Sequence, residues 1–133
     1  MRLDSLLKIS KLEEDEINEK IQSLKSIISS IDNEIDSLKC EISTCELIIS
    51  NPNDILLVKQ SLDYISTLRN NIDSLNTKKS RFYIQLDELN IIYINKKSER
   101  KGFEKLIENQ NKKRQKELEK KENLFLDELN ILS

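Results

Sequence analysis

Residues 17–49 read INEKIQSLKSIISSIDNEIDSLKCEISTCELII, and this stretch decides the fold. Its apolar positions are spaced alternately four and three residues apart: Ile17, Ile21, Leu24, Ile28, Ile31, Ile35, Leu38, Ile42, Cys45 and Ile49. This is the heptad spacing of a helix that packs lengthwise against another helix. The same frame extends backward through Glu14, Ser10, Leu7 and Leu3. We therefore expect a first helix over about 3–50, with polar residues near its start.

The strongest helix-breaking signal in the chain follows at once. Residues 50–54 read Ser-Asn-Pro-Asn-Asp. A proline disfavours the helical conformation of the residue before it, and the Asp after it is a suitable N-cap for a new helix. We interpret 51–54 as the turn of a hairpin, and expect a second helix over about 54–132.

The second helix carries a less regular stripe. We place its first part at Val58, Leu62, Ile65, Arg69 and Ile72. After Ile72 the next position follows after three residues instead of four. The stripe then continues through Leu75, Lys79, Phe82, Leu86, Leu89 and Tyr93. Such a shift predicts a stammer, which overwinds a coiled coil locally. Beyond Tyr93 the frame is mostly polar until Leu118, Phe125, Leu129 and Leu132 restore it.

The composition supports this architecture. One Gly and one Pro in 133 residues cannot supply the turns of a sandwich, a barrel or a doubly wound sheet. The chain combines 22 Lys and Arg and 24 Asp and Glu with regularly spaced Ile and Leu. This composition is typical of a coiled coil. The predicted fold is all-α: a long antiparallel two-helix coiled-coil hairpin with an overhanging C-terminal helix, in one domain over 1–133.

The composition also argues against an enzyme. Without His there is no imidazole base, and a single Gly cannot form a phosphate-binding loop. Cys40 and Cys45 would point about 140° apart on a helix, with Cys45 in the apolar stripe and Cys40 outside it. We expect no catalytic residue, no cofactor, no metal site and no small-molecule substrate. A formal net charge of −2 argues against nucleic acid.

The two helices differ in length. At 1.5 Å per residue they would extend about 70 Å and about 118 Å. Folded at the turn, paired positions would sum to about 105, so that Leu3 faces residue 102. About thirty C-terminal residues would then lack a partner within the chain. The apolar residues left exposed would be Phe103, Leu106, Ile107, Leu118, Leu124, Phe125, Leu126, Leu129 and Leu132.

Charge is unevenly divided along the chain. Residues 1–54 carry 6 basic and 12 acidic groups, whereas residues 96–133 carry 11 basic and 8 acidic ones. The densest basic cluster is Lys112, Lys113, Arg114, Lys116, Lys120 and Lys121. One interpretation is a solvated helix face paired with Glu117, Glu119 and Glu122. The other is a surface that docks an acidic protein.

A further stripe lies beside the expected seam of the second helix. It consists of Tyr64, Leu68, Asn71 and Leu75. These residues have the spacing of a partner-binding helix face. Alternatively, the stammer rotates Leu68 and Leu75 into the core. The sequence leaves both interpretations open.

Three stretches resemble the FliJ family, the stalk proteins of the flagellar type III export ATPase. The first is Arg2-Leu3 with Leu6-Leu7-Lys8-Ile9 and Glu13-Glu14, and the second is Tyr64-Ile65-Ser66-Thr67-Leu68 with Ile72. The third runs from Glu104-Lys105-Leu106-Ile107-Glu108 through Glu117 and Glu122 to Asp127-Glu128. The resemblance covers nearly the whole chain, although this sequence departs from the family in its Asn and Ile content and its lack of Ala.

The resemblance implies a non-enzymatic stalk that links the hexameric export ATPase to the membrane export gate and aids export of flagellar proteins. The implied gate contacts are Tyr64, Leu68, Asn71 and Leu75. Those implied for the ATPase ring are Leu3, Leu6, Leu7, Leu118, Phe125, Leu129 and Leu132. Export chaperones are further implied partners. The implied location is the cytoplasm, at the cytoplasmic face of the inner membrane, in keeping with the expectation from a start without an apolar signal stretch.

Two other functions remain open. The chain also resembles the related injectisome stalk proteins of virulence type III secretion (YscO/SctO type). A generic structural or chaperone coiled coil is the other alternative, in which residues 103–132 would dimerise. Prefoldin-like chaperones are less similar, because they carry β-rich segments between their helices, for which a turn at 51–54 is too short.

Overall fold

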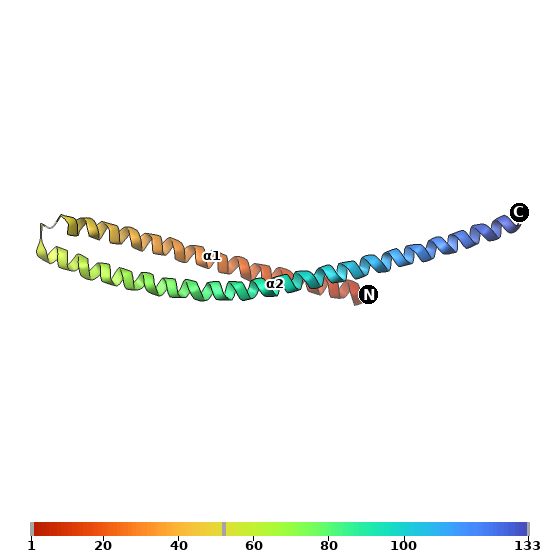
Figure 1. The fold of residues 1–133 in the computed structure, drawn as a ribbon, viewed down its shortest axis with the longest axis horizontal. Helices are drawn as coiled ribbons and strands as arrows, with labels where there is room; N and C mark the ends of the chain where they lie inside the picture. The colour runs from red at the N-terminus through yellow and green to blue at the C-terminus, as the bar shows by residue number, and fades with distance from the viewer. Residues whose placement is uncertain (1, 52, 133) are drawn as a thin grey trace. The chain divides into compact units, whose positions relative to one another are not determined.

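The structure is a computed structural model that describes residues 2–51 and 53–132. Helix α1 (Arg2–Ser50) and helix α2 (Ile55–Leu132) pack against each other as a helical hairpin (Figure 1). Over the described ranges there is no strand. The predicted all-α fold and the bounds of both helices are thus confirmed to within a residue.

The chain divides into two compact units. One comprises Asn18–Ile91, and the other comprises Met1–Ile17 with Ile92–Ser133. Each contains a part of α1 and a part of α2, and each is described below by itself. The single domain expected over 1–133 stays a prediction.

Asp54 sets the start of α2. Its side-chain Oδ1 accepts a hydrogen bond from the amide of Leu56 at 2.9 Å, and its carbonyl accepts one from the amide of Val58 at 3.0 Å. These are the contacts of an N-cap residue, as the sequence predicted. Pro52, to which we assigned the break after α1, lies outside the described residues.

In the unit Asn18–Ile91, the predicted α1 stripe is the core. Ile21, Ile28, Ile31, Ile35 and Cys45 are buried, and the remaining members of the stripe are half-buried. Cys40 is exposed, as expected from its place outside the stripe. The heptad frame of α1 is therefore confirmed along its length.

The predicted α2 frame was wrong over its first part. Leu62 is 53% exposed and Arg69 lies on the surface, whereas Ser61 and Leu68 are buried. The seam of α2 runs without interruption through Val58, Ser61, Ile65, Leu68, Ile72, Leu75, Lys79, Phe82, Leu86 and Leu89. All these spacings are three or four, so no stammer is needed. A small polar residue, Ser61, occupies a position that we had assigned to its apolar neighbour Leu62.

In the other unit, Leu3, Leu7, Ser10 and Glu14 of α1 continue the seam. On α2 it continues through Tyr93, Lys96, Arg100, Phe103 and Ile107, all half-buried. Glu13 contacts Lys96, and Glu14 contacts Arg100. The two residue numbers in each pair sum to more than the expected value of about 105, so the contacts lie several residues farther along α2 than we predicted. Side chains lean toward the N-terminus of their own helix, so contacts in an antiparallel pair are displaced in this direction.

As a result, the covered part of α2 extends about one turn farther than the sequence suggested. Phe103 and Ile107 are half-buried rather than exposed, and Leu106 remains exposed. From Glu108 to Leu132 every residue is exposed. The unpartnered helix is therefore this shorter segment, which we call the C-terminal segment.

The corrected frame is testable by exchanging two neighbouring leucines for alanine. Leu68→Ala should lower the free energy of unfolding by about 2–4 kcal/mol, because Leu68 is 3% exposed in the seam. The matched change Leu62→Ala should cost about 0.5 kcal/mol or less, because the side chain lies on the surface. Urea unfolding followed by circular dichroism measures both. A larger loss of stability for Leu62→Ala than for Leu68→Ala would support the frame with the stammer instead.

Candidate interaction surfaces

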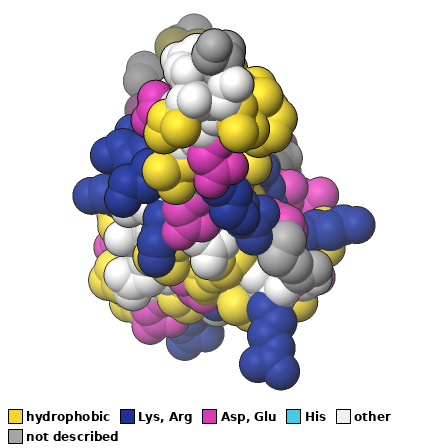
Figure 2. Space-filling view, turned by 90° about the vertical axis from the view of Figure 1, so that its right-hand side faces the viewer, with side chains coloured by type: hydrophobic (Ala, Val, Ile, Leu, Met, Phe, Trp, Pro, Cys, Tyr) yellow, Lys and Arg dark blue, Asp and Glu magenta, His cyan; other side chains and the backbone are white. Residues whose placement is uncertain are grey.

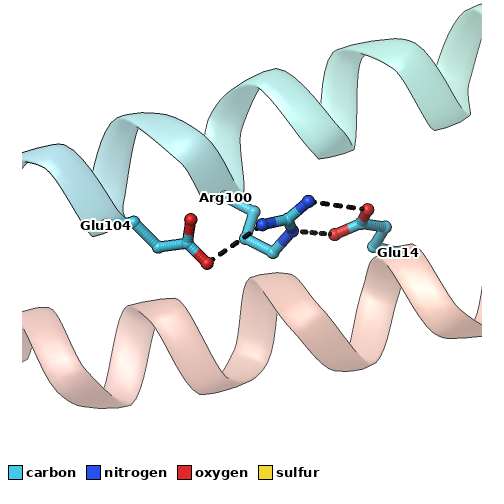
Figure 3. Close-up of polar contacts among 3 residues, drawn as sticks. All are labelled: Glu14, Arg100 and Glu104. Carbon is cyan, nitrogen blue, oxygen red and sulfur yellow. Dashed lines mark hydrogen bonds and ion pairs between the residues drawn. The ribbon is translucent and has the colours of Figure 1, made fainter.

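A polar layer interrupts the seam in the unit that contains the N-terminus. Ser10 and Glu14 of α1 are 1% and 7% exposed, and they share the seam with Lys96 and Arg100 of α2. Arg100 donates two hydrogen bonds to the Glu14 carboxylate, through Nε and one terminal nitrogen. Its other terminal nitrogen donates to Glu104 at 2.9 Å (Figure 3). The guanidinium thus lies between a carboxylate on each helix.

This polar layer favours a single register between the two helices. The hydrogen bond with Glu14, and then that with Glu104, raise the pKa of Arg100. The hydrogen bond with Glu13 raises the pKa of Lys96. A shift of one helix by a heptad would place Glu14 opposite Tyr93 or Ile107 instead of Arg100, and an uncompensated buried charge is strongly destabilising. Polar seam residues of this kind specify register in coiled coils.

The structure divides the Tyr64 to Leu75 stripe between surface and core. Leu68 is buried and Leu75 half-buried in the seam, whereas Tyr64 and Asn71 are exposed. The four residues therefore do not form one accessible face. Of the two interpretations left open, the core holds for Leu68 and Leu75, but they lie there in a continuous frame without a stammer.

Tyr64 is held on the surface by the opposite helix. Its hydroxyl donates a hydrogen bond to Glu41 Oε2 at 3.0 Å, and this bond raises the pKa of the phenol. One turn farther along α2, Arg69 lies 3.8 Å from Glu46. Tyr64 as a whole is 48% exposed, and its hydroxyl end is fixed by the hydrogen bond to Glu41. Such a side chain combines apolar contact area with a hydrogen-bonding group.

The C-terminal segment exposes the largest set of apolar side chains. Among the predicted ring contacts, Leu118, Phe125, Leu129 and Leu132 are 46–84% exposed. Figure 2 shows apolar side chains at the surface among basic and acidic ones at this end. Leu6 is also exposed, whereas Leu3 and Leu7 are half-buried in the seam. Within the basic cluster, Lys112 pairs with Glu108 at 3.2 Å.

Sequence reasoning missed an apolar surface beside the turn. Leu47, Ile55, Leu56 and Leu57 are exposed there. Leu47 and Leu57 also line a shallow cleft of about 360 Å³, together with Thr44, Ile48, Asn51, Asn53, Asp54 and Val58. The available signal was the apolar run at 55–58, which has more large side chains than one seam position can bury.

The described part of the chain offers no evident metal site and no membrane-spanning helix. Within it, no group of three or more acidic, Cys or His side chains is placed to hold a metal ion. Neither helix, over the same residues, has an apolar stretch long enough to span a bilayer. The candidate sites are therefore exposed helix faces.

Comparison with known families decides the relationship. A family model described as "Flagellar FliJ protein" matches residues 1–133, the whole chain. The chain belongs to the FliJ family. Comparisons with curated proteins and with solved structures gave no match. Membership of the FliJ family confirms the resemblance noted in the sequence and implies a component of the flagellar type III export apparatus.

The polar layer of this FliJ-family hairpin can be tested by changing one or both partners. Arg100→Leu alone should lower the melting temperature by several degrees, because Glu14 would keep a buried charge without its partner. Glu14→Leu with Arg100→Leu should melt at or above the wild-type temperature, because an apolar pair carries no desolvation cost. Thermal melts followed by circular dichroism decide this. A double variant less stable than Arg100→Leu would contradict it.

Proposed function

We propose that this FliJ-family protein is a non-catalytic stalk that couples the hexameric export ATPase to the membrane export gate. The supporting observation is the C-terminal segment, a continuous helix from Glu108 to Leu132 whose side chains are all exposed. Exposed apolar side chains in this number mark a binding surface. A helix that projects without a partner can enter a central pore and contact several subunits around it.

The ring contacts would be made by the unit that comprises Met1–Ile17 and Ile92–Ser133. Leu118, Phe125, Leu129 and Leu132 provide the apolar contacts, and Leu6, in the same compact unit, offers another. Leu3 and Leu7 would act mainly by holding the end of α1 against α2, because the seam half-buries them. Asymmetric contact with the ring would bias the conformations of its subunits as ATP is hydrolysed.

Gate contacts would lie in the other unit. Tyr64 and Asn71 are the exposed members of the predicted stripe, and we assign direct contact to them. Leu68 and Leu75 would support that surface from inside the seam, since they are packed against α1. A Tyr side chain already held by Glu41 loses little conformational freedom when a partner binds.

The injectisome alternative has no separate support, because the matching family is a flagellar one. We also propose a location at the cytoplasmic face of the inner membrane and contacts with export chaperones. Both depend on the proposed stalk function.

Removing the last sixteen residues tests the proposed function. A chain that ends at Glu117 should fail to stimulate the cognate export ATPase, because Leu118, Phe125, Leu129 and Leu132 are gone. Its hairpin should remain folded, because no seam residue lies beyond Ile107. ATP hydrolysis by the ring measures the first effect, and circular dichroism measures the second. Full stimulation by the folded, shortened chain would refute insertion into the ring.

The matched control is Leu56→Ala with Leu57→Ala, which removes exposed leucines beside the turn instead. This variant should stimulate the ATPase as the wild type does.

A further inference from the structure

The C-terminal segment is too apolar to remain uncovered. It is a single helix in which Leu118, Leu124 and Phe125 are 60–63% exposed and the two residues at its end, Ile131 and Leu132, more than 80%. In proteins most of the stability of a helix comes from packing of an apolar face rather than from helix propensity. Burial of an apolar face against another helix would supply the missing stability. The spacing and charge of the segment indicate which helix that is.

One face of the segment carries a stripe at spacings of three and four. It consists of Ile107, Asn111, Arg114, Leu118, Glu122, Phe125, Leu129 and Leu132. At 3.6 residues per turn these positions fall on one side of the helix. The seam positions Lys96, Arg100 and Ile107 fall on this side of α2 too. The stripe therefore continues the seam side of α2 beyond the part that α1 covers.

This stripe is complementary to itself when a second copy runs in the opposite direction. Placing Ile107 opposite Leu132 of the other copy brings Asn111 opposite Leu129. The same alignment brings Arg114 opposite Phe125, where a guanidinium can lie against an aromatic ring. Leu118 then meets Glu122 near the centre. Each stripe position thus meets another stripe position, and symmetry repeats each pair.

Charge favours the same antiparallel alignment. Residues 112–116 contain three Lys and one Arg with no acidic residue, whereas residues 122–128 contain Glu122, Asp127 and Glu128 with no basic residue. In the antiparallel pair the basic half of one copy faces the acidic half of the other. A parallel pair would set Arg114 against Arg114 and Glu122 against Glu122. Like charges at such positions destabilise a coiled coil.

We infer that residues 107–132 pair antiparallel with the same residues of a second copy of this chain. The resulting homodimer is symmetric, with the same face used by both copies. It requires no other component, so it stands independently of the proposed stalk function. If that function also holds, the dimer covers the leucines assigned to the ATPase ring, and dimerisation and ring binding exclude each other.

The flanks of the stripe provide a sharp test. Glu117 and Lys121 lie on the same side of the stripe and face each other across the antiparallel pair. Glu117→Lys or Lys121→Glu alone should weaken the homodimer about tenfold, because each replaces two attractive contacts with two repulsive ones. An equimolar mixture of the two variants should restore dimerisation as a heterodimer, since both contacts are again attractive.

Sedimentation velocity of the full chain, from about 1 to 200 μM, measures the fraction of dimer at each concentration and hence the dissociation constant. The matched charge control is Lys120→Glu, on the opposite face, which should leave the dimer unchanged. For the apolar contacts, Leu118→Ala with Leu129→Ala should abolish the dimer. Its control, Leu124→Ala with Ile131→Ala, removes exposed side chains outside the stripe and should have little effect.

Two results would overturn the inference. A wild-type chain that stays monomeric at every concentration would show that the segment does not self-associate. A dimer that survives both charge variants, or variants whose mixture fails to dimerise, would show that Glu117 and Lys121 do not face each other. Circular dichroism of each variant confirms that the hairpin is folded, so that loss of the dimer reflects the interface.

Discussion

The burial of one face on each helix governs the rest of this structure. Two helices packed side by side cover only a narrow seam between them, and among the described residues no third element covers the outer faces. Ile21, Ile28, Ile31 and Ile35 of α1 lie in this seam. Buried members on α2 are Ser61, Ile65, Leu68 and Leu86. Apolar side chains outside the seam stay exposed, so the same constraint that builds the fold also leaves surfaces for partners.

The seam changes character along its length. In the unit Asn18–Ile91 it is largely apolar, and its half-buried Lys79 pairs with Asp32 at 2.9 Å. In the other unit, Ser10, Glu14, Lys96 and Arg100 occupy seam positions. An apolar seam supplies stability but tolerates shifts by whole heptads, whereas buried charges tolerate only one pairing. The polar seam residues at Glu14 and Arg100 are therefore the ones that we expect to specify the register.

Much of this could be predicted from the sequence. Both helices and the α1 seam follow from regular Ile and Leu spacing. The α2 seam was misplaced because Leu62 is apolar and Ser61 is not. Following the frame backward from Leu86 would have given Ser61 and Leu68 without an irregularity. Burial of Leu68 is a property of the pair, since Tyr64 and Leu68 look equivalent on an isolated helix.

The partner-binding residues are harder to predict, for a physical reason. Exposure of Leu118, Phe125 and Leu129 shows that the hairpin does not bury them, while their partner's chemistry lies outside the chain. Apolar spacing alone does not distinguish parallel from antiparallel pairing of two helices. The charge pattern of the C-terminal segment does, because it favours the antiparallel pair. That is why the C-terminal segment supports an inference about a second copy, whereas the apolar surface at Leu47 and Ile55 does not.

The central claim is that α1 covers α2 as far as Ile107, and that the described residues beyond it have no cover within the chain. Amide hydrogen exchange, measured at the lowest practicable protein concentration, tests it most directly. Protection should be high along the seam on both helices and should fall steeply beyond Ile107. It should rise again in residues 108–132 only when a partner is present. Protection through Leu132 in the dilute monomer, equal to that around Leu68, would contradict the account.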